Sequence, residues 1–72
     1  MFWRLMMQVK INGAVTELAD NASIQDLLLA KKLPAEIVVI ELNGEIIKRE
    51  KWESLKLSTN DNLEIIRIIG GG

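Results

Sequence analysis

The sequence predicts an α+β domain in which one main helix covers one face of a mixed sheet of four to five β-strands. Three observations predict it: two Asn-Gly pairs that each join strand-like segments, one amphipathic segment with a helix-capping pattern, and a β-branched segment near the C-terminus. The chain has 72 residues, of which 49% are hydrophobic. This is enough for one small core and too little for two domains.

The first hairpin is predicted by alternation around the first Asn-Gly pair. Val9 and Ile11 are apolar between polar neighbours, which is typical of a half-buried strand. Asn12-Gly13 supplies the residues that a type I′ turn favours, so residues 14–18 are expected to return as the second strand. Residues 1–6 are expected to be an N-terminal extension that is either added to the first strand or not native. This stretch is too short for a signal peptide.

A helix is expected to begin after Ser23, because Asp26 follows three residues later as in a capping box, with aspartate in place of glutamate. The segment has one apolar face, and two lysines are expected in its last turn, where cations complement the helix dipole. A proline then prevents continuation. The residues are Ile24, Leu27 and Leu28 on the apolar face, Lys31 and Lys32 in the last turn, and Pro34.

The segment IVVIELNGEII, residues 37–47, contains the strongest hairpin signal in the chain. A β-branched run leads into Asn43-Gly44, and an apolar pair follows. Alternation predicts one set of side chains facing the core and the other set on the outer face. The expected core set is Val38, Ile40 and Leu42, and the expected outer set is Ile37, Val39 and Glu41.

The rest of the chain is expected to form a helical turn, a loop and a last strand. Residues 49–53 lack strand alternation and are too few for a stable helix, so a turn anchored by Trp52 is expected. Residues 58–62 have turn chemistry, and residues 63–69 read as the final strand. One helix covers the sheet only if the first and last strands lie side by side in its middle, in parallel. This is the β-grasp, or ubiquitin-like, arrangement, expected over residues 7–69.

Composition excludes several classes of function. There is no histidine and no cysteine, which removes disulfides, thiol nucleophiles and the usual zinc ligands. The formal net charge is -1 with signs mixed along the chain, so nucleic-acid and membrane partners are not expected. We expect a cytoplasmic protein with no bound cofactor or metal. Its carboxylates are expected on the surface of a domain too small for a cleft, so it is not expected to be an enzyme.

Gly70, Gly71 and Gly72 are expected to form a flexible C-terminal tail. Without Cβ atoms, an extended tail can pass through a channel too narrow for side chains and reach about 10 Å beyond the last strand. The α-carboxylate of Gly72 lies at its tip. This ionised group becomes a good electrophile only if another enzyme activates it, for example with the α-phosphate of ATP. The plain alternative is a flexible linker.

The final strand offers a docking surface beside the root of this tail. Isoleucines occur on both alternating faces of residues 63–69, so one of them stays exposed whichever face is buried. An exposed apolar patch there would suit a partner enzyme. Ile66, Arg67 and Ile68 are the candidate docking residues. The alternative is that residues 1–5 or a second copy of the chain cover this patch.

Residues 7–72 resemble the ThiS family, within the ThiS and MoaD group of β-grasp proteins. The stretch LNGEIIKREKW resembles the family's Asn-Gly turn, apolar pair, and arginine followed three residues later by an aromatic, here Arg49 and Trp52. DNLEIIRIIGGG resembles its aspartate, alternating strand and terminal glycines, and MQVKINGA is typical but less specific. Lys48 and Asn60 depart from a common proline and a common glycine, and neither departure touches the tail.

The resemblance implies a sulfur carrier for thiamine biosynthesis. In such carriers a ThiF-like enzyme, related to ubiquitin E1, uses ATP to adenylate the terminal glycine. Sulfur from a cysteine persulfide, which a cysteine desulfurase supplies, then replaces AMP and leaves a thiocarboxylate for a ThiG-like thiazole synthase. Gly72 would carry the sulfur, Gly71 would allow the narrow approach and Gly70 would be a spacer. Arg49 and Trp52 would serve the fold or docking.

Three alternatives stay open from the sequence. A MoaD-like carrier for molybdopterin or a tungsten cofactor would use the same terminal chemistry. A ubiquitin-like protein modifier would be joined through Gly72 to lysines of other proteins. A plain interaction module would keep its biology without Gly71 and Gly72.

Overall fold

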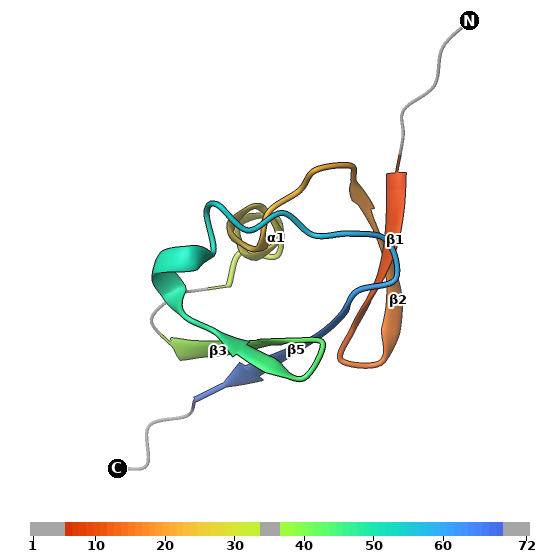
Figure 1. Ribbon diagram of the computed structural model, residues 1–72. Helices are drawn as coiled ribbons and strands as arrows, with labels where there is room; N and C mark the ends of the chain where they lie inside the picture. The colour runs from red at the N-terminus through yellow and green to blue at the C-terminus, as the bar shows by residue number, and fades with distance from the viewer. Residues whose placement is uncertain (1–5, 34–36, 69–72) are drawn as a thin grey trace, which may run out of the picture.

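A five-stranded mixed sheet and helix α1 make up the fold of the computed structural model, which describes residues 6–33 and 37–68 (Figure 1). The elements in chain order are β1 (Met6–Ile11), β2 (Ala14–Ala19), α1 (Ile24–Ala30), β3 (Val38–Leu42), β4 (Glu45–Ile47), the 3₁₀ helix η2 (Arg49–Lys51) and β5 (Asn62–Arg67). The strand order is β2-β1-β5-β3-β4, and β1 pairs with β5 in parallel. The predicted β-grasp arrangement is therefore confirmed.

Both hairpins turn through an Asn-Gly pair, as predicted. The φ angles are 51° and 85° at Asn12 and Gly13, and 51° and 88° at Asn43 and Gly44. A type I′ turn needs positive φ at both positions, and asparagine and glycine reach this region at the lowest steric cost. The turns bring β2 against β1 and β4 against β3 in antiparallel register.

The start of α1 agrees with the predicted capping box. The Ser23 hydroxyl accepts a hydrogen bond from the Asp26 amide at 3.0 Å, and the Asp26 carboxylate accepts one from the Ser23 amide at 3.0 Å. Ile24, Leu27 and Leu28 are buried, so the apolar face packs inward as expected. In Figure 1 the curved sheet wraps around α1, which is seen end-on.

The end of α1 differs from the expectation that Lys31 and Lys32 lie in its last turn. Lys31 is the C-cap, and Lys32 has a left-handed φ of 57°. The Lys32 amide donates to the Leu29 carbonyl at 3.1 Å, and the next amide donates to the Leu28 carbonyl at 3.0 Å, as in a Schellman motif. The backbone therefore closes the helix before Pro34, which lies outside the described residues.

The core lies between α1 and the inner face of the sheet. In β3, Val38 and Ile40 are 6% and 0% exposed, which confirms the predicted alternation, and Leu42 is half-buried against the core. Ile37 also packs against the core instead of facing outward, because it precedes β3 and strand alternation does not apply to it. The fully buried side chains are Trp52, Ile24, Leu27, Leu28, Ile40, Leu63 and Val9.

The ends of the outermost elements are shifted from the expected bounds. β1 already begins at Met6, the last residue of the expected extension, and Met6 lies opposite Ala19. β5 begins one residue earlier than expected and ends at Arg67. The loop before it contains Asn60, whose φ of 73° lies in the left-handed region that asparagine tolerates better than most residues.

Protonation of Asp26 is expected to weaken the start of α1. The hydrogen bond from the Ser23 amide, followed by the bond with its side chain, holds the pKa of Asp26 below its usual 3.8. A carboxylate with a lowered folded-state pKa contributes stability that is complete above 3.8 and is lost as the pH falls through this value toward the folded-state pKa. Chemical denaturation at stepwise lower pH should therefore show a larger loss for the wild type than for Asp26→Asn. Equal losses would contradict this prediction.

Candidate docking face and root of the C-terminal tail

The sheet face away from α1 carries exposed isoleucines next to the end of β5. The register places Val39 of β3 opposite Ile66 of β5. Ile46 of β4 lies on the same face, and Ile46, Ile66 and Ile68 are 65%, 48% and 54% exposed. We call Val39, Ile46, Ile66 and Ile68 the apolar patch. It is assembled from three neighbouring strands, as the order of β5, β3 and β4 in the sheet requires.

The apolar patch lies at the root of the tail, by which we mean Arg67 and Ile68, the last two residues that the structure describes. The Ile68 amide donates to the Ile37 carbonyl at 2.7 Å, so the chain is still bonded to the segment before β3 one residue beyond the end of β5. Gly70, Gly71 and Gly72 lie outside the described residues, and their roles stay predictions. Arg67 lies opposite Val38 and is exposed, on the face opposite to that of Ile66.

A pair of carboxylates borders the apolar patch on the same face. Glu41 and Glu64 lie directly opposite each other on β3 and β5, and both are half-buried. Like charges in this position oppose sheet pairing. A partner surface that fits here would therefore gain from apolar groups over the patch and from a positive charge beside them.

Trp52 and Arg49 have different surroundings. Trp52 is 2% exposed, and its Nε1 donates to the Ile47 carbonyl at 3.0 Å, so its side chain belongs to the core. The Arg49 carbonyl accepts from the Trp52 amide at 3.1 Å, which closes η2. The Arg49 side chain is exposed and lines a depression of about 360 Å³ together with Val39 and Ile46. Arg49 therefore adjoins the apolar patch, whereas the Trp52 side chain lies in the core beneath it.

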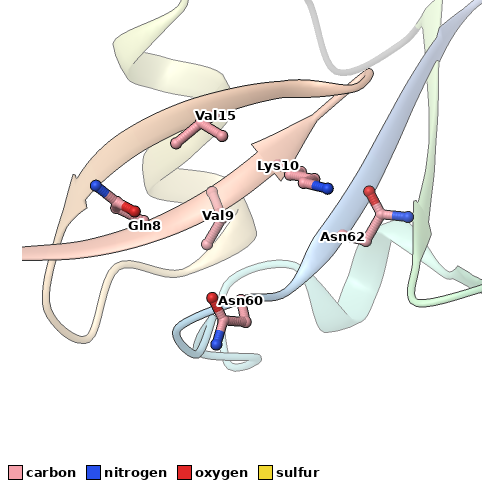
Figure 2. Close-up of a pocket in the computed structure, with 6 residues that line it drawn as sticks. All are labelled: Gln8, Val9, Lys10, Val15, Asn60 and Asn62. Atoms are coloured by element: carbon pink, nitrogen blue, oxygen red, sulfur yellow. The ribbon is translucent and has the colours of Figure 1, made fainter.

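A second depression, of about 390 Å³, lies near the start of β5, away from the tail root at the other end of this strand, and Figure 2 shows the residues that line it. It is found where β5 begins beside β1. Its lining residues are Gln8, Val9, Lys10, Val15, Asn60 and Asn62. This lining contains no carboxylate, hydroxyl, thiol or imidazole, and Lys10 supplies its one ionisable side chain.

Within 6–33 and 37–68, no group of three or more acidic, cysteine or histidine side chains is placed to hold a metal ion. No helix in this part of the chain is long and apolar enough to span a membrane.

The two turn asparagines make contacts that sequence reasoning missed. It assigned Asn12 and Asn43 only to turns, yet both side chains bind the final strand. The Asn43 side-chain oxygen accepts from the Asn62 amide at 2.9 Å, and its nitrogen donates to the Asp61 carboxylate at 3.1 Å. Asn12 bonds Ile65 in a similar way. The Asn-Gly pairs mark both asparagines as turn residues, but the sequence does not indicate which residues of the final strand their side chains bind.

Comparison with known proteins agrees with this geometry. The ThiS family model matches residues 9–72. The chain belongs to the ThiS family. A sulfur carrier protein ThiS of Bacillus subtilis is 42% identical over 53 residues, which cover 74% of this chain and 80% of that protein. The family resemblance drawn from the sequence is therefore confirmed.

Solved ThiS structures share the fold of this ThiS-family chain. The crystal structure of the thiamine biosynthesis protein ThiS from Geobacter metallireducens has a TM-score of 0.80 and 33% sequence identity, covering 92% of this chain and all of that one. A thiazole synthase of Magnetococcus marinus is 26% identical over 66 residues, which are 92% of this chain and 20% of that protein. A fifth of that synthase is thus similar to a whole ThiS-family domain.

Proposed function

We propose that the chain is a sulfur carrier of thiamine biosynthesis and that it carries sulfur on the carboxyl group of Gly72. The observation that carries the proposal is the ThiS family match, which extends from residue 9 through the terminal glycines. The described residues add a supporting geometry, because the last strand leads into the tail beside an exposed apolar patch. The chain acts as a substrate of other enzymes in this proposal and provides no catalytic side chain.

The proposed loading has two steps at the main-chain carboxyl of Gly72. First, a carboxylate oxygen attacks the α-phosphorus of ATP, which forms an acyl adenylate and releases pyrophosphate. A persulfide sulfur then attacks the acyl carbon and displaces AMP, and cleavage of its S–S bond by a thiol leaves the thiocarboxylate and a disulfide. The adenylating enzyme is ThiF-like and related to ubiquitin E1, and a cysteine desulfurase supplies the persulfide. All of these components act in the cytoplasm.

The acceptor in this proposal is a ThiG-like thiazole synthase. Support comes from thiazole synthases of Magnetococcus marinus and Paramagnetospirillum magneticum, in which a segment similar to this chain makes up 20% of the protein. Joining a carrier to its acceptor raises the effective concentration of the carrier at the acceptor site. A ThiS-like segment within a thiazole synthase therefore favours thiazole formation as the destination of the sulfur.

The test is intact-protein mass spectrometry of the whole chain. The protein is incubated with ATP, a cysteine desulfurase with cysteine, and the host's ThiF-like enzyme, and a sample without ATP is the control. The expected result is a mass gain equal to sulfur replacing oxygen, located on the C-terminal peptide and absent without ATP. An unchanged mass would overturn the proposal. Attachment of the chain to lysines of other proteins would instead show a modifier, and delivery only to molybdopterin synthesis would show a MoaD-like carrier.

Docking through the apolar patch is expected to depend on Ile66. Ile66→Ala removes an exposed side chain beside the tail root, and truncation of an interface anchor of this size typically costs about 1 to 2 kcal/mol of binding. The KM of the adenylating enzyme for the carrier should therefore rise about 5- to 30-fold.

The matched control for Ile66→Ala is Val15→Ala. Val15 is 62% exposed on the same outer face but lies on β2, at the other side of the sheet. The Val15 variant should keep the wild-type KM. Docking through the apolar patch would be contradicted if both variants behaved like the wild type, or if both raised the KM equally.

A further inference from the structure

The parallel ladder between β1 and β5 is short. Only Lys10 opposite Asn62 and Ile11 opposite Leu63 are paired across these strands, and the chain then turns at Asn12 into β2. β5 continues to Arg67. The half of β5 that leads into the tail therefore extends past the end of β1.

Asn12 continues this ladder beyond the end of β1. Its backbone amide donates to the Leu63 carbonyl at 2.9 Å. Its side-chain oxygen accepts from the Ile65 amide at 2.8 Å, and its side-chain nitrogen donates to the Ile65 carbonyl at 3.4 Å. The side-chain amide thus binds both polar groups of one β5 residue, as a peptide unit of a neighbouring strand would.

We propose that Asn12 is a positioning residue for the C-terminal tail. β5 is held on one side by β3, through Val39 opposite Ile66 and the bond from the Ile68 amide to Ile37. On its other side, Asn12 holds it at Ile65, three residues before the end of the described chain. With both sides held, the root of the tail keeps one direction relative to the apolar patch. This inference rests on the proposed carrier function, in which the tail enters a partner active site.

Asn43 provides a matched control within the same chain. It also occupies the first position of an Asn-Gly turn with a φ of 51°, and its side chain also binds β5. Its contacts, however, are with Asn62 and Asp61 at the beginning of the strand. Losing the Asn43 side chain should therefore cost stability without loosening the tail root.

The test compares Asn12→Gly with Asn43→Gly in the full chain. Glycine keeps the positive φ of each turn and removes the side chain with its amide, and both variants gain the same backbone freedom. Hydrogen exchange at the Ile66 and Ile68 amides should be about 5-fold faster in Asn12→Gly, as expected if the two lost side-chain contacts to Ile65 together contribute about 1 kcal/mol, and unchanged in Asn43→Gly. With the adenylating enzyme, Asn12→Gly should lower kcat several-fold and leave KM within about twofold, because docking through the apolar patch persists while the tail is less often in place.

Two results would overturn the positioning role. In the first, Asn12→Gly has the same exchange rates and the same kcat as the wild type. In the second, both variants change equally, which would show a general loss of stability. The exchange measurement needs no partner enzyme. If the wild-type chain is never loaded with sulfur, the carrier function fails while the exchange data still decide whether Asn12 holds the tail root.

Discussion

Ile40→Ala is expected to lower the free energy of unfolding by about 2 to 5 kcal/mol, because it removes buried methyl groups and leaves a cavity. Ile40 is 0% exposed in the central part of the core, on the strand beside β5. A chain of 72 residues without cysteine, and therefore without disulfides, is expected near the low end of about 5 to 15 kcal/mol. The variant should therefore be largely unfolded at moderate denaturant or temperature. Urea denaturation followed by tryptophan fluorescence measures the change, since Trp52 is buried in the same core.

Ile46→Ala is the matched control for Ile40→Ala. Ile46 is one strand away, on β4, and 65% exposed on the outer face, so its truncation should change stability by less than about 0.5 kcal/mol. A large loss in Ile46→Ala, or a small one in Ile40→Ala, would mean that the assigned inner and outer faces of the sheet are wrong.

Gly72→Ala is expected to abolish sulfur loading while the melting temperature stays at the wild-type value. The added methyl group lies beside the reacting carboxyl, where a channel that fits only backbone has no room for it. The expected loss is complete within detection, and mass spectrometry after incubation with ATP, the desulfurase and the adenylating enzyme measures it. A lowered melting temperature would contradict a free tail.

Gly44→Ala gives the opposite pattern and serves as the control for Gly72→Ala. Gly44 has a φ of 88° in the second hairpin turn, so alanine there should destabilise the domain by about 1 to 2 kcal/mol through backbone strain. Nothing lies within 4 Å of a Cβ built at this position, so the effect is conformational rather than steric crowding. Folded Gly44→Ala should still accept sulfur. Loading of Gly72→Ala at the wild-type rate would contradict the proposed role of the terminal glycine.

The features that the sequence predicted well are local ones. Each Asn-Gly pair sets its own turn through φ values that few other residues adopt. The capping box at the start of α1 joins Ser23 to Asp26, only three residues apart. The parallel pairing of β1 and β5 is not local, but element order and the single helix left little other choice.

The features that could not be predicted from the sequence are of two kinds. Some are backbone conformations that no residue type indicates, and others are contacts between residues far apart in the chain. Lys32 closes α1 in a left-handed conformation that glycine usually adopts, so nothing in the sequence indicated the early end. The Asn12 side chain binds Ile65, which is 53 residues away, and Asn43 binds Asn62 across 19 residues. Such contacts exist only once the strands have assembled in register.

The sequence by itself determined the family, the two turns, the helix start and the terminal glycines, because each depends on residue identity over a short stretch. Only the tertiary structure decided which isoleucines are exposed. Alternation of side chains along β5 allows either face to be buried, and the choice is made when Leu63 and Ile40 join the core that the apolar face of α1 also forms. That choice leaves Ile66 and Ile68 outside, next to Val39 and Ile46 from strands that are distant in sequence and adjacent in space.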